Sequence, residues 1–152
     1  MFRGINAINL DEKGRMAVPT RYRAELAESC EGQLILTIGF DRCLLLLPLP
    51  TFEEVERKLM KLPMMDPRVQ RVKRLLIGHA AECELDGQGR FLVPELLRNF
   101  AGISKRVALV GQGNVFEIWN EETWHQSREQ WHDVVSLDDL RELSPELGSL
   151  TF

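Results

Sequence analysis

The chain has 152 residues, of which 44% are hydrophobic and 28% are charged, and its formal net charge is −4. This composition is typical of a globular protein, and the length suffices for one ordinary domain or two small ones. No apolar run reaches the roughly 20 residues that a membrane helix needs, and the N-terminus lacks the basic and apolar regions of a signal peptide. The three cysteines form no CxxC pair. We therefore expect a cytoplasmic protein with reduced thiols and no membrane partner.

The charge is distributed unevenly along the chain. Residues 1–23 carry five Lys or Arg against two acids, and residues 57–79 carry seven against Asp66 alone. Residues 117–152 instead carry nine acids against two arginines. A basic front and an acidic tail are compatible with docking a polyanion on one face, and they fit a solvated helix and an acidic terminus as well.

From the N-terminus, the first predicted unit alternates strands and helices. INAINL (5–10) carries the apolar residues Ile5, Ile8 and Leu10, and RMAV (15–18) alternates as a returning strand should, which predicts two strands joined as a tight hairpin by a turn of Asp and Gly. Pro19 suits the first turn of a helix, PTRYRAEL. Two strands around GFD follow, and TFEEVERKLMKL (51–62) then predicts an amphipathic helix that opens with a capping box.

Residues 53–80 are predicted to form a helical linker between two such units. Apolar residues recur there at helical spacing: Met65, Val69, Val72 and Leu76. Basic residues occupy the other positions: Arg68, Arg71, Lys73 and Arg74. A basic run of this kind is usually a solvated helix face, and we interpret this run in the same way.

The second half of the chain repeats the first. LDEKGRMAVP at 10–19 returns as LDGQGRFLVP at 85–94, and seven of the fourteen positions of 10–23 are identical 75 residues later. Further on, ILTIGFDRCLLLLPLPTF matches VALVGQGNVFEIWNEETW, and a second capping box, TWHQ, is predicted at 123–126. Two copies of one unit of roughly 45 residues are predicted.

These copies are residues 5–52 and 81–124, and residues 125–152 form an acidic helical tail. A unit this small buries little surface by itself, so the two are expected to complete each other's sheet as a pseudo-dimer.

Each turn contains Asp and Arg four positions apart: Asp11 and Arg15 in the first copy, Asp86 and Arg90 in the second. Gly14 and Gly89 can adopt the positive φ that such a turn requires. The carboxylate can hold the guanidinium in place and leave its other donors free for phosphate oxygens or guanine edges. The alternative is an internal Asp–Arg pair that only pins the turn. Because the pair occurs twice, with Lys13 or Gln88 between, we favour a DNA contact.

The sequence gives little support for metal binding, nucleotide binding or catalysis. His79, His125 and His132 form no HxxxH pattern, no glycine loop ends in Gly-Lys-Ser/Thr, and no Ser or Cys lies in a nucleophile motif. We therefore expect no enzymatic activity, metal, cofactor or small-molecule substrate. Trp124 and Trp131, seven residues apart, are expected to be core or subunit contacts.

On its start FRGINAINLDEKGRMAVPTRYR and its second motif LDGQGRFLVPELLR, the chain resembles the MraZ family, bacterial regulators built from two SpoVT-AbrB-like units. The resemblance covers nearly the whole length. It implies an α+β, mainly β fold, a tandem AbrB-like swapped-hairpin β-barrel pseudo-dimer with peripheral helices. It also implies a homo-oligomeric ring that binds repeated double-stranded DNA sites upstream of the division and cell-wall gene cluster, including the promoter of its own gene.

The resulting hypothesis is a nucleoid-associated transcription regulator. Arg15 and Arg90 are expected to contact DNA, with Lys13 and Arg3 as supporting phosphate contacts, while Asp11 and Asp86 orient the arginines. Two alternatives stay open: an AbrB-like antitoxin that binds a toxin with its tail, and a structural oligomer whose Asp–Arg pairs are internal staples. Antitoxins of this type usually carry one unit and a disordered tail, whereas this tail has a Trp-containing amphipathic pattern.

Overall fold

A computed structural model describes residues 1–149, which form two compact units, residues 1–121 and the residues from Glu122 onward. Residues 150–152, the end of the predicted acidic tail, lie outside the described residues. Within the described part of the chain, no helix has both the length and the apolar character needed to cross a membrane.

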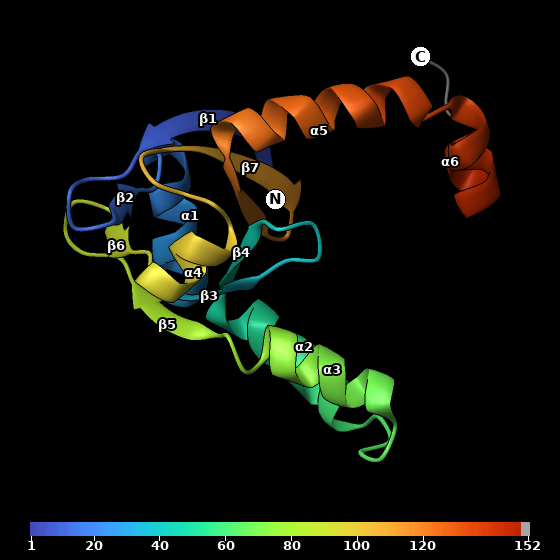
Figure 1. The fold of residues 1–152 in the computed structure, drawn as a ribbon, viewed down its shortest axis with the longest axis horizontal. Helices are drawn as coiled ribbons and strands as arrows, with labels where there is room; N and C mark the ends of the chain where they lie inside the picture. Colours follow the sequence, from blue (N-terminus) through green and yellow to red (C-terminus); the bar gives the residue numbers. More distant parts are fainter. Residues whose placement is uncertain (150–152) are drawn as a thin grey trace. The chain divides into compact units, whose positions relative to one another are not determined.

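The elements of the two halves follow one order (Figure 1). The first half comprises β1 (Phe2–Asn9), β2 (Arg15–Ala17), α1 (Thr20–Cys30), β3 (Gln33–Ile38), β4 (Leu44–Pro48) and α2 (Leu49–Met60). After α3 (Pro67–Leu76), the second half comprises β5 (Ala81–Glu84), β6 (Arg90–Leu92), α4 (Glu95–Phe100), β7 (Arg106–Gly113) and β8 (Phe116–Asn120). The chain continues with α5 (Glu121–Val134), α6 (Leu137–Leu143) and α7 (Pro145–Gly148). The predicted succession of strands and helices in each copy is confirmed.

Strands from the two copies are interleaved in the sheets. Six strands form one antiparallel sheet in the order β1-β7-β8-β4-β3-β5, and β2 and β6 form a separate two-stranded sheet. Four of the pairings join one copy to the other: β1 with β7, β2 with β6, β3 with β5, and β4 with β8. The two copies thus complete each other's sheets, as the small size of one copy predicts. The described strands form an open sheet ending at β1 and β5, where the resemblance implies a closed barrel.

The strands on either side of each Asp-x-x-x-Arg turn do not pair with each other. β1 pairs with β7 and β2 with β6, and the equivalent strand β5 pairs with β3. The prediction of two local hairpins is therefore wrong. Exchange of strands between the copies explains the difference, because one shared sheet removes more apolar surface from water than two small separate hairpins would.

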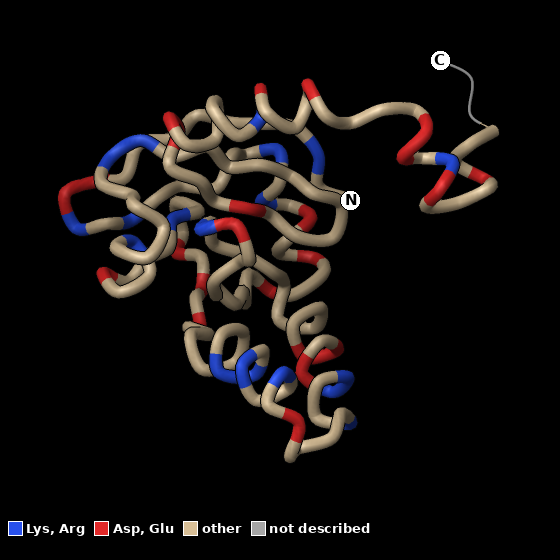
Figure 2. The backbone as a smooth tube through the Cα atoms, turned by 45° about the vertical axis from the view of Figure 1, so that its right-hand side comes forward, with Lys and Arg blue, Asp and Glu red and all other residues tan. Residues whose placement is uncertain are grey.

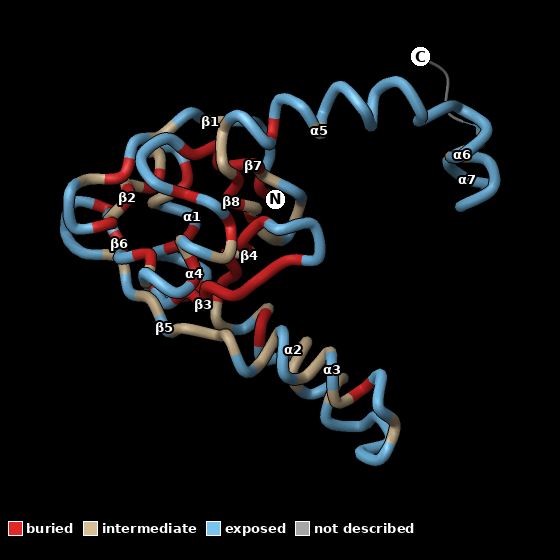
Figure 3. Tube along the Cα trace, in the orientation of Figure 1, coloured by how far each residue is buried: buried red, intermediate tan, exposed pale blue. Residues whose placement is uncertain are grey.

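The main core lies along the strands, with helices α1 and α4 contributing to it (Figure 3). At its centre, Phe116 of β8 stacks on Phe2 of β1, with ring centroids 4.2 Å apart. Tyr22 of α1 meets the Phe116 ring edge-on at 4.9 Å. A residue of the second half therefore packs against two residues of the first half.

The helix starts differ from the predicted capping boxes. Thr51 lies inside α2, whose N-cap position is Pro48, and Thr123 is the third residue of α5. Both predicted boxes are therefore wrong. A capping box does occur at α6, where the Ser136 side chain accepts from the Asp139 amide and the Asp139 carboxylate accepts from the Ser136 amide. Pro48 at the N-cap and Pro50 in the first turn of α2 bring its start forward, because proline suits the first turn of a helix.

Candidate nucleic-acid interface

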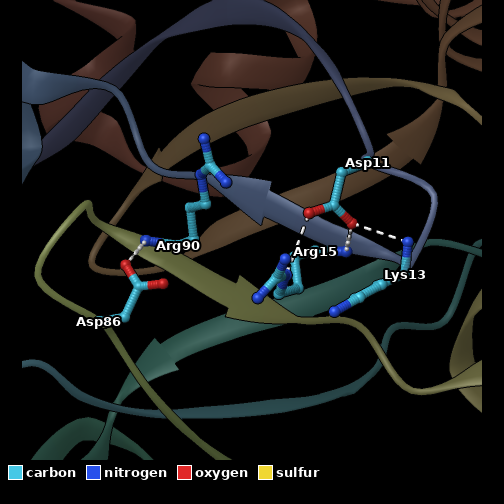
Figure 4. A network of polar contacts seen from close by, with 5 residues as sticks. All are labelled: Asp11, Lys13, Arg15, Asp86 and Arg90. Atoms are coloured by element: carbon cyan, nitrogen blue, oxygen red, sulfur yellow. Dashed lines mark hydrogen bonds and ion pairs between the residues drawn. The ribbon is translucent and has the colours of Figure 1, made fainter.

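The first turn is held together by one carboxylate. Oδ1 of Asp11 accepts hydrogen bonds from the backbone amides of Lys13 and Arg15, each 2.9 Å long, and Oδ2 accepts from Nε of Arg15 at 3.0 Å (Figure 4). The amide of Asp11 donates to the Arg15 carbonyl, and the Gly14 amide donates to the Asp11 carbonyl. Asp11 therefore fixes both the backbone of the turn and the direction of the arginine.

The second turn repeats the backbone arrangement but not the side-chain contact. Oδ1 of Asp86 accepts from the amides of Gln88 (2.8 Å) and Arg90 (2.9 Å), and the Gly89 amide donates to the Asp86 carbonyl. The Arg90 guanidinium points away from Asp86 in Figure 4, and no ion pair joins the two residues in the described contacts. The expected carboxylate–guanidinium contact is thus present in the first turn and absent from the second.

Glycine is required in both turns by the backbone conformation. Gly14 has a φ of +84° and Gly89 a φ of +71°, which side chains rarely adopt. Both glycines are buried, although the turns around them are largely exposed. They are therefore covered by other parts of the chain.

The two turns are joined to each other through β2 and β6. In that antiparallel pair Arg15 lies opposite Leu92, Met16 opposite Phe91, and Ala17 opposite Arg90. Beyond the ladder, the Val18 amide donates to the Gly89 carbonyl and the Val93 amide donates to the Gly14 carbonyl, both at 2.9 Å. These bonds are equivalent under the 75-residue repeat, so the two turns form one pseudo-symmetric assembly.

The arginines lie on the open side of this small sheet. Met16 and Phe91 are buried, whereas Arg15 is partly exposed and Arg90 is exposed, as the alternation of side chains along a strand requires. Lys13 is exposed at the tip of the first turn. Three cationic side chains from two copies thus share one solvent-facing site.

Arg3 does not lie beside the turns. It is an exposed residue near the start of β1, six residues from Asn9 at the other end of that strand. At about 3.3 Å per residue, this places it roughly 20 Å from the end that leads into the first turn. Nearness in the sequence therefore did not indicate a shared site.

Two further arginines do belong to the site. Arg23 of α1 lies against Gly89, and Arg98 of α4 lies against Gly14, so each helix covers the turn of the other copy. Arg23 and Arg98 are the last of the seven identical positions in the repeat. Their identity in the two copies could have marked these residues as part of the site, but no local sequence pattern indicated what they contact.

Hydrogen bonding lowers the pKa of both turn carboxylates. For Asp11 the largest cause is the bond from the Arg15 amide, and for Asp86 it is the bond from the Arg90 amide. The positive charge of Arg15 also lowers the pKa of Asp86, which is consistent with the nearness of the two turns. Both carboxylates therefore remain ionised at neutral pH.

This lowering predicts a loss of stability in acid. A carboxylate with a lowered pKa in the folded state stabilises the fold fully above its ordinary pKa, and the contribution disappears as the pH falls through the lowered value. We expect the urea concentration at the unfolding midpoint to decrease as the pH is lowered from about 5 to about 3. The decrease should be smaller in the Asp11→Asn/Asp86→Asn variant. Urea titrations over this pH range measure both curves, and parallel curves would contradict the prediction.

The remaining reactive groups do not suggest catalysis. Burial raises the pKa of Cys43 to about 12 and that of Cys83 to about 11, so both are protonated at neutral pH. The described residues contain no group of three His, Cys, Asp or Glu side chains arranged to hold a metal.

Lys and Arg residues also lie along α2 and α3 (Figure 2), where Arg68 is paired with Asp66 and Lys58 with Glu54.

Comparison with known proteins gives one consistent result. The family described as "MraZ protein, putative antitoxin-like" matches residues 1–75 and again residues 76–142. The chain is 65% identical to the "Transcriptional regulator MraZ" of Methylococcus capsulatus, over 152 residues that cover 100% of both chains. It is 55% identical to the protein of that name from Thioalkalivibrio sulfidiphilus, over 99% of both chains. The Escherichia coli K12 protein is 51% identical, over 97% of this chain and 99% of its own.

Proposed function

The chain belongs to the MraZ family, and on this basis we propose that it is a DNA-binding transcription regulator whose two Asp-x-x-x-Arg turns contact DNA. Its relatives are named as transcriptional regulators, which favours regulation over catalysis. The observation that carries the proposal is the joined pair of turns, which presents Arg15 and Arg90 from one small sheet.

The two arginines suit different parts of this task. Arg15 is held by Asp11 through Nε, which leaves the terminal NH₂ groups available and reduces the rotamer freedom lost on binding. Arg90 is exposed and not held by Asp86, so it can adapt to the DNA. Guanidinium groups bind phosphate oxygens and can donate two hydrogen bonds to guanine in the major groove. Lys13 at the turn tip is assigned to a phosphate, and Arg3 to phosphates farther along the duplex.

The carboxylates act on the turns and do not face the DNA. A carboxylate directed at a phosphate would repel it. Asp11 and Asp86 instead accept hydrogen bonds from the turn amides, which partly neutralises their charge locally. Gly14 and Gly89 provide the turn conformation that makes those bonds possible.

We further propose that the targets are repeated sites upstream of the division and cell-wall gene cluster, including the promoter of the chain's own gene. Few cationic contacts per chain would bind weakly in a protein of net charge −4. A homo-oligomeric ring multiplies these contacts, and linked sites raise the effective concentration without new contacts. The protein would then act in the cytoplasm, associated with the nucleoid. The boundaries 5–52, 53–80, 81–124 and 125–152 remain our proposal for the division of the chain.

The direct test is a fluorescence anisotropy titration with a labelled fragment from upstream of the chain's own gene. The control is a fragment of the same length and composition in scrambled order. We expect tighter binding to the upstream fragment, with log Kd rising with log salt. Equal affinity for both fragments would contradict sequence-specific regulation.

The family description also mentions antitoxins, so a second candidate function is that of an antitoxin. An antitoxin would bind DNA through the same turns and a toxin through the tail. Pull-down with the full chain from its own cells, with a variant ending at Glu121 as the control, separates the two. A tail-dependent partner that inhibits growth when expressed without this chain would support the antitoxin function.

Replacing Asp11 tests the positioning role of a turn carboxylate. We expect Asp11→Ala to bind the upstream fragment about tenfold more weakly, although a negative charge has been removed, because Arg15 loses its orientation. Asp86→Ala is the matched control with the same change in charge. It should lose less affinity, since Asp86 does not contact the Arg90 guanidinium. Tighter binding by Asp11→Ala would show that its charge opposes DNA.

A further inference from the structure

Arg23 and Arg98 each cover the turn of the opposite copy. A Cβ placed on Gly14 would lie 2.8 Å from Cζ and 3.0 Å from Nε of Arg98. A Cβ placed on Gly89 would overlap Nε of Arg23 and lie 2.7 Å from its Cζ. Real Cβ atoms almost never approach other atoms this closely, so the two guanidinium groups fill the space in which a side chain would stand.

The contact of Arg23 is built into the connection between the turns. Its Nε donates to the carbonyl of Val18 at 2.8 Å, while the amide of Val18 donates to the carbonyl of Gly89. The same arginine bounds a hollow of about 240 Å³ beside the second turn, which Asp86 also lines. Shortening Arg23 would enlarge this hollow and leave the turn unsupported on that side.

The contact of Arg98 with Gly14 leaves one polar atom of Arg98 without a hydrogen bond in the described structure. Its Nε is buried and has no hydrogen-bond partner in the described structure. Such groups are rare in proteins and call for an explanation. A flat guanidinium packed on the Gly14 backbone provides one, because a narrow planar group fits where a branched side chain would not.

We propose that Arg23 and Arg98 are positioning residues, each of which fixes the DNA-contacting turn of the opposite copy, so that both turns meet DNA as one rigid pair. The inference rests on the proposed function for its effect on DNA binding. The contact between arginine and glycine can be tested in the folded chain without DNA.

A conservative substitution separates positioning from direct contact with phosphate. A lysine keeps the charge and can still reach a phosphate, but it lacks the planar group that covers the glycine. We expect Arg23→Lys and Arg23→Ala to weaken binding to the upstream fragment alike, by about tenfold, the size of an ordinary coupling between touching residues. If Arg23→Lys binds like the unaltered chain while Arg23→Ala does not, the residue is a phosphate contact and the proposal is wrong.

A double-mutant cycle tests the contact itself. Gly89→Ala is combined with Arg23→Ala as the matched pair and with Arg98→Ala as the mismatched pair, and urea midpoints and Kd for the upstream fragment are measured. We expect the matched double variant to lose less than the sum of its single variants, because removing Arg23 makes room for the new methyl group. The mismatched pair should be additive, because Arg98 covers the other turn. Additivity in both pairs would overturn the proposal.

The outcomes also separate this inference from the proposed function. If the unaltered chain binds no DNA, the function fails, while coupling in the urea midpoints still reports the contact. If the midpoints show coupling but neither arginine variant changes Kd, the contact is only structural and the positioning role is wrong. If Gly89→Ala does not fold, the comparison of Arg23→Lys with Arg23→Ala decides.

Discussion

The Arg15→Ala/Arg90→Ala variant is expected to lose DNA affinity by about 30-fold or more while it stays folded and assembled. Each good contact of a guanidinium with a base edge is worth about 1–3 kcal/mol, so two contacts per chain amount to roughly 2–6 kcal/mol. Where the contacts are to phosphates, the slope of log K against log salt should become shallower by about 0.9 for each. Titration with the upstream fragment at several salt concentrations measures both quantities.

The matched control removes the same charge from another part of the first unit. Arg57 and Arg71 are exposed on α2 and α3, and the Arg71 side chain donates to the carbonyl of Pro67. Arg57→Ala/Arg71→Ala should bind with nearly unchanged affinity. Light scattering on both variants distinguishes the alternative in which the Asp–Arg pairs are staples, because that alternative requires the Arg15/Arg90 variant to unfold or dissociate.

Removing the ring of Phe116 is expected to lower the free energy of unfolding by about 3–5 kcal/mol. The residue is fully buried and makes aromatic contacts with Phe2 and Tyr22. Because those partners belong to the other copy, the substitution should weaken the association between the halves along with the local packing. Urea unfolding of Phe116→Ala, followed by circular dichroism at fixed protein concentration, gives the value.

Phe40→Ala is the control for that experiment. Its side chain is 74% exposed in the connection between β3 and β4, so its removal leaves no cavity. The change in unfolding free energy should stay within about 0.5 kcal/mol. A similar small effect for Phe116→Ala would mean that the two copies are stabilised independently of this aromatic cluster.

Much of the local structure could be predicted because it depends on nearby residues. The strand-forming residues of INAINL and RMAV are visible in the sequence, and so are the Asp and Gly of the turns. The partner of each strand is a different matter, since β1 could pair with β2 or with β7 without any change in its own pattern. The small size of one copy indicated that the halves must combine, and the family resemblance implied the same.

The site was predictable where one short segment contains it. Asp11 and Arg15 are four residues apart and do form the expected contact. Arg90 has the same spacing from Asp86, but its guanidinium does not contact the Asp86 carboxylate. The spacing along the chain does not determine the rotamer of an exposed arginine side chain. Arg23 reaches Gly89 across 66 positions of the sequence, and that contact depends on how the copies combine.

The most direct test of the central claim is a hydroxyl-radical footprint on the DNA upstream of the chain's own gene. In the proposed ring, the two turns of each chain should protect short segments at regular spacing. The Arg57→Ala/Arg71→Ala control should preserve this pattern, and Arg15→Ala/Arg90→Ala should abolish it. Protection that is absent, continuous, or unchanged in the Arg15/Arg90 variant would show that these turns are not what binds the DNA.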